Sequence, residues 1–325
     1  MSQSVTATAA GAPGNPVLAE VVRSGFVEGR HRGSLVMLGA DGAVESAIGE
    51  VTSPVFPRSA NKPMQAAGVL RAGLDLAGER LALAAGSHSG EPFHRDLVRE
   101  MLDEHGLTPE HLRCPASLPL DQQEQEAWLA AGGRRDRVAM NCSGKHAAML
   151  AAAALRNWPL ESYPDPDHPL QQVIRTVVEE TAGEPVAAVG VDGCGAPLMA
   201  ISLTGLARAF RCFVRAAPGS PERRVADAMR AHPAYVAGTR RHDTWLMREV
   251  PGLLSKVGAE AVQAVALPDG RALALKVDDG GARALGPVLA RALRLLGVTA
   301  PVVERVGRAP VLGGGREVGE VRAVF

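Results

Sequence analysis

Ser59 and Lys62 are three residues apart in the segment 57–65, PRSANKPMQ. Residues at this spacing project from the same face of a helix. A serine alcohol is a poor nucleophile at neutral pH, and a neutral amine beside it is one of the few groups that could take its proton. The Ser-x-x-Lys spacing therefore predicts a nucleophile and its base, although the same two residue types also occur together at ordinary solvated helix starts.

Pro63 indicates where the helix that carries Lys62 should begin. Proline is tolerated only in the first turn of a helix, so we expect Ser59 at or just before the helix start. There the positive end of the helix dipole would disfavour the ammonium form of Lys62 and favour a developing alkoxide on Ser59.

Lysine is rare in this sequence. Of the 35 basic residues only four are lysines, namely Lys62, Lys145, Lys256 and Lys276. Arginine fills almost every other cationic position, so a lysine is needed only where an amine must lose its proton near neutrality. This pattern favours a chemical role for Lys62 and marks Lys145 and Lys256 as further candidates.

Lys256 lies in the segment 255–258, SKVG. A Ser-x-x-Lys motif followed later in the chain by Lys-x-Gly is the order found in penicillin-binding proteins and β-lactamases, where both lysines face one serine. Lys-x-Gly is common, so this second motif alone would be weak evidence.

Two cysteines and a lysine form a third candidate site. Cys142 and Lys145 lie in one Gly-containing turn, and Cys194 lies in another after an apolar run. Thiolates far apart in sequence can meet on one zinc ion, which binds sulfur readily. Lysine is a rare ligand because its nitrogen must first lose a proton. The alternative is that both cysteines are small buried side chains, as free cysteines usually are.

The composition excludes several classes of function. The formal net charge is zero, which gives no indication of nucleic acid or of an anionic membrane as a partner. We find no apolar stretch of membrane-spanning length. Residues 1–16 lack the pattern of a secretory signal and are predicted to be a disordered tail. The four cysteines form no close-spaced disulfide signature, which favours a cytoplasmic protein with free thiols.

Runs typical of strands lie at both ends of the chain, and helical periodicity dominates between them. Strands are expected near residues 18–22, 33–37, 43–48, 186–191 and 318–324, and residues 261–267 and 271–277 flank a Pro-Asp-Gly turn as a hairpin. Helices are expected over 64–74, 93–105, 147–155, 170–182, 198–216 and 281–296. This order predicts an α+β fold with one sheet built from both chain ends. We expect one catalytic unit over 17–325, with the sheet-containing part at about 17–62 and 186–325 and a mostly helical part at about 63–185.

Five ordered blocks of the sequence together resemble the asparaginase II family, the rhizobial-type or class 3 L-asparaginases. The resemblance runs from about residue 18 to about residue 296, and motifs of the other asparaginase types are absent. The blocks are 58–63 (RSANKP), 87–91 (SHSGE), 141–146 (NCSGKH), 166–169 (PDHP) and 192–194 (DGC).

The resemblance implies a fold similar to serine β-lactamases and glutaminases, and a homodimer. It implies two Ser–Lys pairs, which fall on Ser59 with Lys62 and on Ser87 with Lys256. It also implies a zinc-type site, which carries over to Cys142, Lys145 and Cys194, and substrate-binding residues, which carry over to Arg58, His88 and Asp192. Relatives can have a cysteine within the segment that matches residues 241–247, where this chain has Asp243 instead.

The function that this resemblance implies is hydrolysis of L-asparagine to L-aspartate and ammonia through a serine acyl-enzyme. Two alternatives remain open. One is a related Ser–Lys amidohydrolase, such as a glutaminase or a β-lactam-hydrolysing enzyme. The other is a zinc-stabilised binding protein without enzymatic activity, which would have no need of Lys62 or Lys256.

Overall fold

The computed structural model of the chain describes residues 14–325. Most of the tail predicted for residues 1–16 therefore lies outside the described residues. Asn15 is described, and its side chain donates to Asp278 Oδ1 at 2.9 Å and accepts from the backbone of Glu50 at 2.8 Å.

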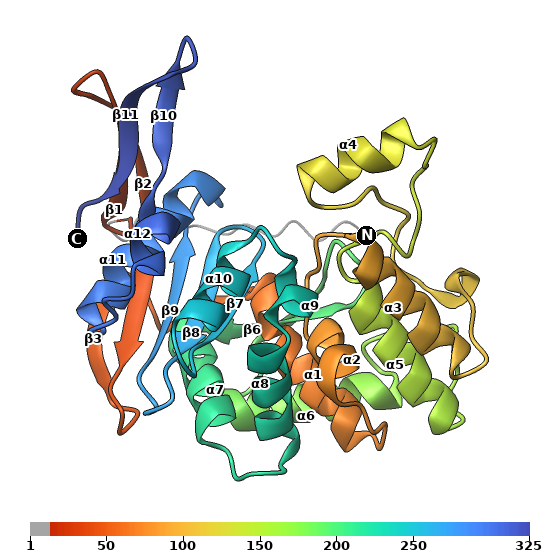
Figure 1. The fold of residues 1–325 in the computed structure, drawn as a ribbon. Helices are drawn as coiled ribbons and strands as arrows, with labels where there is room; N and C mark the ends of the chain where they lie inside the picture. The colour runs from red at the N-terminus through yellow and green to blue at the C-terminus, as the bar shows by residue number, and fades with distance from the viewer. Residues whose placement is uncertain (1–13) are drawn as a thin grey trace, which may run out of the picture.

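An antiparallel sheet of eight strands joins the two ends of the chain (Figure 1). The order of its strands is β10-β11-β1-β2-β9-β8-β7, and β3 also pairs with β2. β2 is long enough to pair with β1 along its first half and with β3 and β9 along its second half. The strands are β1 Val17–Arg23, β2 Phe26–Leu38, β3 Val44–Ile48, β7 Leu254–Gly258, β8 Val262–Ala266, β9 Ala272–Val277, β10 Pro310–Gly313 and β11 Arg316–Ala323.

Helices cover both faces of the sheet around β8 and β9. Nearly every residue of these two strands is buried, although alternate side chains point to opposite faces. α7 and α11 both contact β8 and β9, and α11 also contacts β11. Beyond this covered part, β1, β2, β10 and β11 continue as the more exposed arm at the upper left of Figure 1. The helices named here are α7 Leu203–Arg215 and α11 Ala282–Leu295, followed in the chain by α12 Val302–Gly307.

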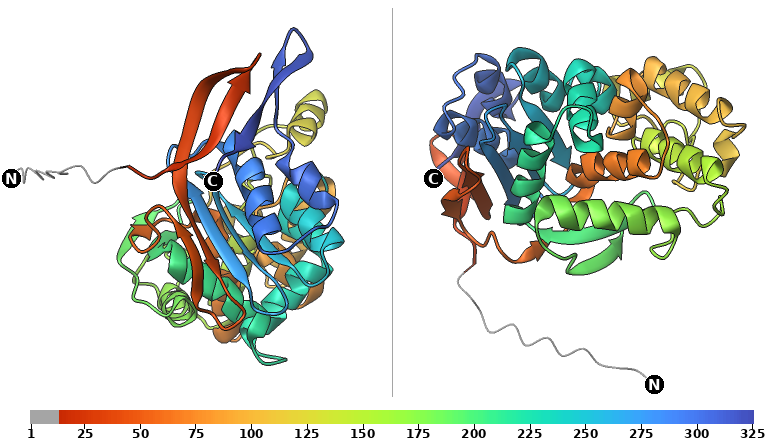
Figure 2. Two further views of the ribbon diagram at one scale, coloured as in Figure 1. Left: turned by 90° about the vertical axis from the view of Figure 1, so that its left-hand side faces the viewer. Right: turned by 90° about the horizontal axis from the view of Figure 1, so that it is seen from below.

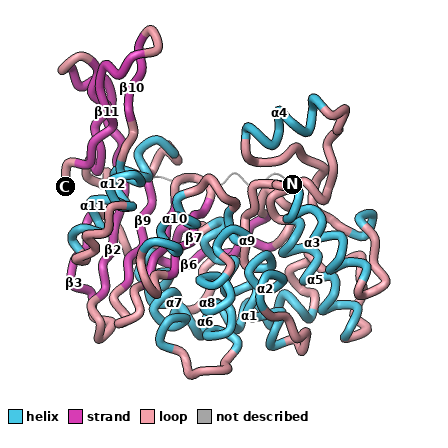
Figure 3. Tube along the Cα trace, viewed as in Figure 1, coloured by secondary structure: helices cyan, strands magenta, loops and turns pink. Residues whose placement is uncertain are grey.

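The remaining helices gather beside the other edge of the sheet, as the separation of cyan helices from magenta strands shows in Figure 3. α1 is buried from Lys62 to Leu70, as expected of a helix surrounded by its neighbours α5, α6 and α8. Figure 2 shows the same grouping from two further sides. These elements are η1 Arg58–Asn61, α1 Lys62–Arg71, α2 Gly78–Ala84, α3 Pro92–Asp103, η2 Pro109–His111, α4 Gln122–Ala130, α5 Ser143–Leu155, α6 Pro169–Ala182, α8 Pro221–Ala231, α9 Pro233–Ala237 and α10 His242–Glu249.

A second, small sheet has the order β4-β6-β5, with β4 Pro54–Val55, β5 Ala188–Val191 and β6 Pro197–Ser202. The sequence predicted a helix over 198–216, but its first residues form β6. The prediction was wrong there because a short, continuous apolar run suits a buried strand as well as a buried helix. The helix begins only at Leu203, where the Ser202 side chain caps it by accepting from the backbone of Gly205.

The segment with Ser59 and Lys62 lies at the contact between the helices and the sheet. η1 packs against β7 and β8, and α1 then continues into the helical part. Gly258 makes this approach possible, since a Cβ on it would lie 2.3 Å from the backbone oxygen of Pro57. The glycine of the Lys-x-Gly pattern therefore has a steric reason in the fold.

The predicted α+β fold, with a sheet from both chain ends and a mostly helical middle, is confirmed. The start of α1 at Lys62, with Pro63 in its first turn, also agrees with the expectation. Within residues 14–325, none of the helices has both the length and the apolar character needed to cross a bilayer.

Candidate active site

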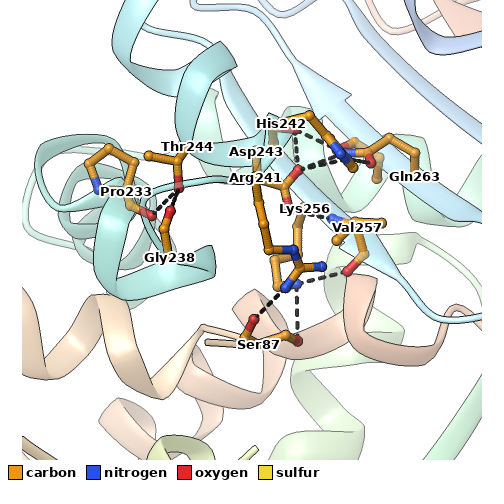
Figure 4. A network of polar contacts seen from close by, with 12 residues as sticks. Ser87, Pro233, Gly238, Arg241, His242, Asp243, Thr244, Lys256, Val257 and Gln263 are labelled. Atoms are coloured by element: carbon orange, nitrogen blue, oxygen red, sulfur yellow. Dashed lines mark hydrogen bonds and ion pairs between the residues drawn. The ribbon is translucent and has the colours of Figure 1, made fainter. Parts of the chain in front are cut away.

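Ser87 lies between two buried lysines, one from the helical part of the molecule and one from the large sheet. It belongs to the loop between α2 and α3, and its Oγ accepts from Lys62 Nζ at 2.8 Å and from Lys256 Nζ at 3.2 Å. Lys62 is the first residue of α1, whereas Lys256 lies in β7, the last strand of the large sheet. Figure 4 shows Lys256 directed toward Ser87. The hydroxyl is thus held at the contact between helices and sheet.

Each lysine has a second, backbone partner that fixes its direction. Lys62 Nζ donates to the carbonyl of Gly86 at 2.5 Å, and Lys256 Nζ donates to the carbonyl of Val257 at 2.7 Å. Both side chains are buried. Burial lowers the pKa of Lys62, and burial lowers the pKa of Lys256 to about 7 although the nearby charge of Asp243 opposes the shift. These amines can therefore exist without a proton far more readily than exposed lysines.

Ser59 lines a cavity of about 530 Å³, and Ser87 lies on the same wall. The sequence predicted a direct pair of Ser59 and Lys62. In the structure Lys62 instead donates to Ser87 and to the carbonyl of Gly86. The two residues remain close in the chain, because Ser59 lies in η1 and Lys62 begins the helix that follows it directly. The structure thus brings both lysines together on Ser87, with Ser59 on the same cavity wall.

Arg58 precedes Ser59 and has a backbone conformation that non-glycine residues seldom adopt, with φ at 51°. Its Nε donates to Asp192 Oδ1 at 2.8 Å, and its Nη1 lies 3.6 Å from Glu260 Oε1. Asp192 is in the loop between β5 and β6. Two of the three residues expected to bind a substrate are therefore already paired with each other next to Ser59.

His88 has no exposed surface, and both of its ring nitrogens contact protein groups. Nδ1 accepts from the backbone of Gly90 at 3.2 Å, and Nε2 lies 2.9 Å from Ser143 Oγ. Burial lowers the pKa of His88 well below its usual value, so the ring is neutral. Direct contact with a substrate would require one of these bonds to break. The bonds instead hold the loop that carries Ser87 against the start of α5.

Three further residues line the cavity beside Ser87 that the sequence motifs did not single out as site residues: Asn141, Arg241 and His242. Arg241 Nη1 donates to the carbonyl of Ser87 at 2.8 Å. Among the many arginines of the chain nothing local marks this one. Asn141 belongs to the block that contains Cys142, and this was the available signal for it.

Cys142, Lys145 and Cys194 also come together. Cys142 precedes α5, Lys145 lies in its first turn, and Lys145 Nζ donates to Cys194 Sγ at 3.2 Å. Cys142 Sγ donates to Asn141 Oδ1 at 3.0 Å. The neighbouring Cys142 thiol and the charge of Lys145 lower the pKa of Cys194, whereas the neighbouring Cys194 and burial raise the pKa of Cys142. Burial alone would lower the pKa of Lys145, but the thiolate of Cys194 outweighs it and raises the pKa overall. The contact between Lys145 Nζ and Cys194 Sγ thus favours a positive charge on the amine and a negative charge on the sulfur.

The donor types of this cluster fit a borderline-soft cation such as Zn²⁺, because it offers two sulfurs and one nitrogen. Within residues 14–325, no three His, Cys, Asp or Glu side chains are grouped to hold a metal ion, so Lys145 would have to serve as the third ligand. Cys194 Sγ also lies 3.6 Å from Asp192 Oδ2. The cluster thus lies directly behind the residue that pairs with Arg58.

A serine hydroxyl between two amines of lowered pKa, on the wall of a cavity, is suited to acyl transfer at an amide, which is the chemistry of amidohydrolases that use serine and lysine. The comparison with known families agrees. The L-asparaginase II family matches residues 19–323, and the chain belongs to this family. The protein is thus an amidohydrolase.

The similarities to solved structures are weak, and the family assignment does not depend on them. A β-lactamase from Mycobacterium bovis is 15% identical, with 82% of this chain and 94% of that chain covered and a TM-score of 0.46. Mglu in its tris and glutamate form is 17% identical, with 86% of this chain and 63% of that chain covered and a TM-score of 0.35. This chain therefore spans less than two thirds of Mglu. EstCE1, a hydrolase with promiscuous acyltransferase activity, is 14% identical, with 77% of this chain and 91% of that chain covered and a TM-score of 0.39. No curated protein matches the chain.

Proposed function

We propose that the protein hydrolyses L-asparagine to L-aspartate and ammonia through a serine acyl-enzyme. The observation that carries the proposal is the hydroxyl of Ser87 between Lys62 and Lys256, on the cavity that Ser59 also lines. Ser59 is the proposed nucleophile because it is half-buried on the cavity wall, whereas Ser87 on the same wall is only 4% exposed and is engaged by both amines. The family membership supports the same class of reaction.

In the first half of the reaction, Ser59 Oγ bonds to the side-chain amide carbon and its proton passes to neutral Lys62. The carbon–nitrogen bond then breaks. Because Lys62 is hydrogen-bonded to Ser87, and Ser87 to Lys256, the proton can move along these groups to the leaving nitrogen, which departs as ammonia. The lowered pKa values of both lysines support this role, since only an unprotonated amine can accept a proton.

In the second half, water attacks the aspartyl ester on Ser59. The amine that is unprotonated at that stage takes a proton from the water, and Ser59 regains a proton as the ester bond breaks. Aspartate is released and the cluster returns to its starting protonation state. The same relay is thus used in both directions.

Arg58 and Asp192 are proposed to bind the α-carboxylate and the α-ammonium group of the substrate. Their charges are opposite, they lie next to Ser59, and their mutual bond of 2.8 Å keeps both in place before the substrate arrives. A substrate with both charges could exchange this bond for one to each of its own ends. This favours a free amino acid amide over an uncharged amide.

We further propose that Cys142, Lys145 and Cys194 hold Zn²⁺ in the active protein. When bound, the ion would act as a Lewis acid that fixes its ligands and polarises nearby oxygens. Cys194 lies next to Asp192, so a zinc ion bound to Cys194 would mainly hold Asp192 in place for the substrate. Elemental analysis after purification without added metal tests occupancy, and full activity after chelation would show that the cluster is structural only.

The decisive experiment compares ammonia release from L-asparagine and L-glutamine, with nitrocefin as a β-lactam probe. We expect the highest kcat/KM for asparagine. A preference for glutamine or nitrocefin would favour the related amidohydrolases, and no turnover of any of them would contradict the proposed function. Ser59→Ala should abolish turnover, and near-normal activity in this variant would exclude Ser59 as the nucleophile.

We also propose that the protein is a homodimer and that it is cytoplasmic. All four cysteines are free thiols, which suits a reducing compartment. Sedimentation of the purified chain tests the dimer directly, and a monomer at micromolar concentration would contradict it.

A further inference from the structure

Asp243 carries a buried carboxylate to which the proposed reaction assigns no role. It is the second residue of α10, and its side chain has no exposed surface. Burial of an ionised carboxylate is unfavourable unless strong partners compensate it. The question is therefore which groups keep this charge in place, and what they have in common.

The partners of Asp243 lie on both sides of Lys256. Oδ1 accepts from Ser255 Oγ at 2.7 Å, and Oδ2 accepts from the backbone N–H of Val257 at 2.9 Å. β7 is the last strand of its sheet, so the Val257 N–H has no neighbouring strand to donate to. One carboxylate thus bonds the residue before Lys256 and the residue after it, and fixes the strand from which Lys256 reaches Ser87.

The remaining contacts lead from the carboxylate to the cavity. Gln263 Nε2 donates to Asp243 Oδ1 at 3.0 Å and to Ser255 Oγ at 2.9 Å, and Gln263 Oε1 lies 2.9 Å from His242 Nε2. His242 is part of the cavity wall. Figure 4 shows Asp243, Gln263 and His242 grouped on the side of Lys256 away from Ser87. The network is completely hydrogen-bonded, which makes its geometry rigid.

The charges around Lys256 differ in sign. Lys62 and Arg241 face it with positive charge, and both lower its pKa, as burial does. Asp243 and, more weakly, Cys142 act in the opposite direction. The carboxyl of Asp243 is itself ionised, because His242, Lys256 and its hydrogen bonds outweigh burial and lower its pKa to about 2.

We propose that Asp243 is a positioning residue for the reaction: it holds Lys256 against Ser87 by bonding the residues on either side of that lysine, and it places a negative charge beside the amine. The inference rests on the proposed amide hydrolysis and adds to it a residue that acts through Lys256. A carboxylate in this place does two things at once, since it fixes the strand as an acceptor and stabilises the ammonium as a charge.

The test is the pH dependence of kcat in Asp243→Asn. The amide keeps the shape of the side chain but removes its charge. Both carboxylate oxygens of Asp243 accept hydrogen bonds, and the NH₂ group that replaces one of them cannot accept any. We expect kcat at its optimum to fall about tenfold to a hundredfold through misplacement of Lys256. Without the negative charge Lys256 loses its proton more easily, so the acidic limb of the profile should move to lower pH by about one unit.

Ser255→Ala is the matched control. It removes one hydrogen-bond partner of Asp243 and leaves the charge in place, so kcat should fall less and the acidic limb should stay where it is in the wild type. Asp243→Ser is a second variant without charge, smaller than the natural residue, whose hydroxyl oxygen can still accept a hydrogen bond. It should move the acidic limb in the same direction as Asp243→Asn.

Each outcome decides the inference. A folded Asp243→Asn or Asp243→Ser protein with an unmoved acidic limb would overturn it, and Asp243 would then serve only to cap the outer strand. Failure of both variants to fold, with a stable Ser255→Ala protein, would also overturn it. Wild-type protein that releases no ammonia from asparagine, glutamine or nitrocefin-class substrates is a different result, since it contradicts the proposed function itself.

Discussion

Ser87 accepts hydrogen bonds from two amines, and this limits how many protons the cluster can hold. Two ammonium groups on one oxygen repel each other, and Lys62 indeed lowers the pKa of Lys256. The titration of such a group belongs to the whole cluster and not to one residue. We therefore expect the cluster to hold at most one ammonium group near neutral pH, which leaves at least one neutral amine to accept a proton.

The first prediction concerns pH. The pKa of Lys256 is lowered to about 7, so the amine is neutral above this pH and protonated below it. We expect kcat to fall about tenfold for each pH unit below an acidic limb near 7. Steady-state ammonia release between pH 5 and 9, in buffers of constant ionic strength, measures it. A rate that is flat down to pH 5 would contradict a role for neutral Lys256.

The same shift affects stability with a definite sign. The folded pKa of Lys256 is about 7, below the ordinary value of 10.5, so the unfolded chain binds more protons between these two values. The unfavourable burial of the ammonium is fully present below about pH 7 and is relieved as the pH rises toward 10.5. For this group alone, the free energy of unfolding should rise with pH across that window, and Lys256→Met should remove the rise. Denaturant unfolding of both proteins at several pH values tests it.

The second prediction concerns the metal. Lys145→Arg keeps the positive charge beside Cys194 but replaces the amine by a guanidinium that cannot lose its proton. We expect the variant to purify without zinc while it remains folded, and the wild-type protein to lose zinc as the pH falls, because Lys145 must be unprotonated to bind it. Elemental analysis gives the result, with Lys276→Arg as the control that should change nothing. Zinc at wild-type occupancy in Lys145→Arg would exclude Lys145 as a ligand.

At the level of single residues, the sequence predicted which side chains gather but not how they pair. The rarity of lysine drew attention to Lys62, Lys145 and Lys256, and all three side chains are buried. Lys276 is an exception, because it donates to the backbone carbonyls of Glu260 and Val277 and lies outside the site. The bond from Lys62 to Ser87 was not foreseen, because it depends on how closely the loop after α2 approaches α1.

β7 is the element that determines the site geometry, since it carries Lys256 and packs on η1 with Ser59. The third prediction is that Gly258→Ala separates β7 from η1. The added Cβ would lie 2.3 Å from the Pro57 oxygen, so backbone must move. We expect a loss of about 1–3 kcal/mol in the free energy of unfolding, from overpacking, and a fall in kcat of at least about tenfold.

Gly29→Ala is the control for this prediction. A Cβ at Gly29 would meet its nearest atoms at 3.7 Å, an ordinary contact, and Gly29 lies in the exposed arm of β2. Its stability should change by no more than about 0.5 kcal/mol, with unchanged kcat. If Gly258→Ala behaves like Gly29→Ala in chemical denaturation and in ammonia release, then the close approach of β7 to η1 is not required.

The sequence identified most elements by their type, and the exceptions have a physical reason. The hairpin around Pro268-Asp269-Gly270 is confirmed as β8 and β9, because its turn residues and alternation agree. β6 was missed, since its pattern is a short apolar run without alternation. Pairing across the sheet could not be predicted strand by strand, because it depends on which distant segments meet.

In the molecule as a whole, β1 lies between β11 and β2. The last strand of the chain therefore covers the edge of β1 that β2 leaves free. The fourth prediction is that truncation after residue 308, which removes β10 and β11, exposes this edge. Uncovered edge strands pair with other chains. We expect a lower Tm and association that grows with protein concentration, measured by thermal unfolding and light scattering. A truncated protein with the Tm and particle size of the full chain would refute it.

The pairing of the two chain ends also has a consequence for synthesis. β2 can meet β9 only after most of the chain has left the ribosome, and contacts between such distant segments form slowly. Until then β1, β2 and β3 of a nascent chain can pair with one another but lack their late partners β9 and β11, and Ser59 and Lys62 have been made long before Lys256. The enzyme should therefore be inactive, and prone to association, through most of its translation, and it should acquire its relay only when the sheet closes.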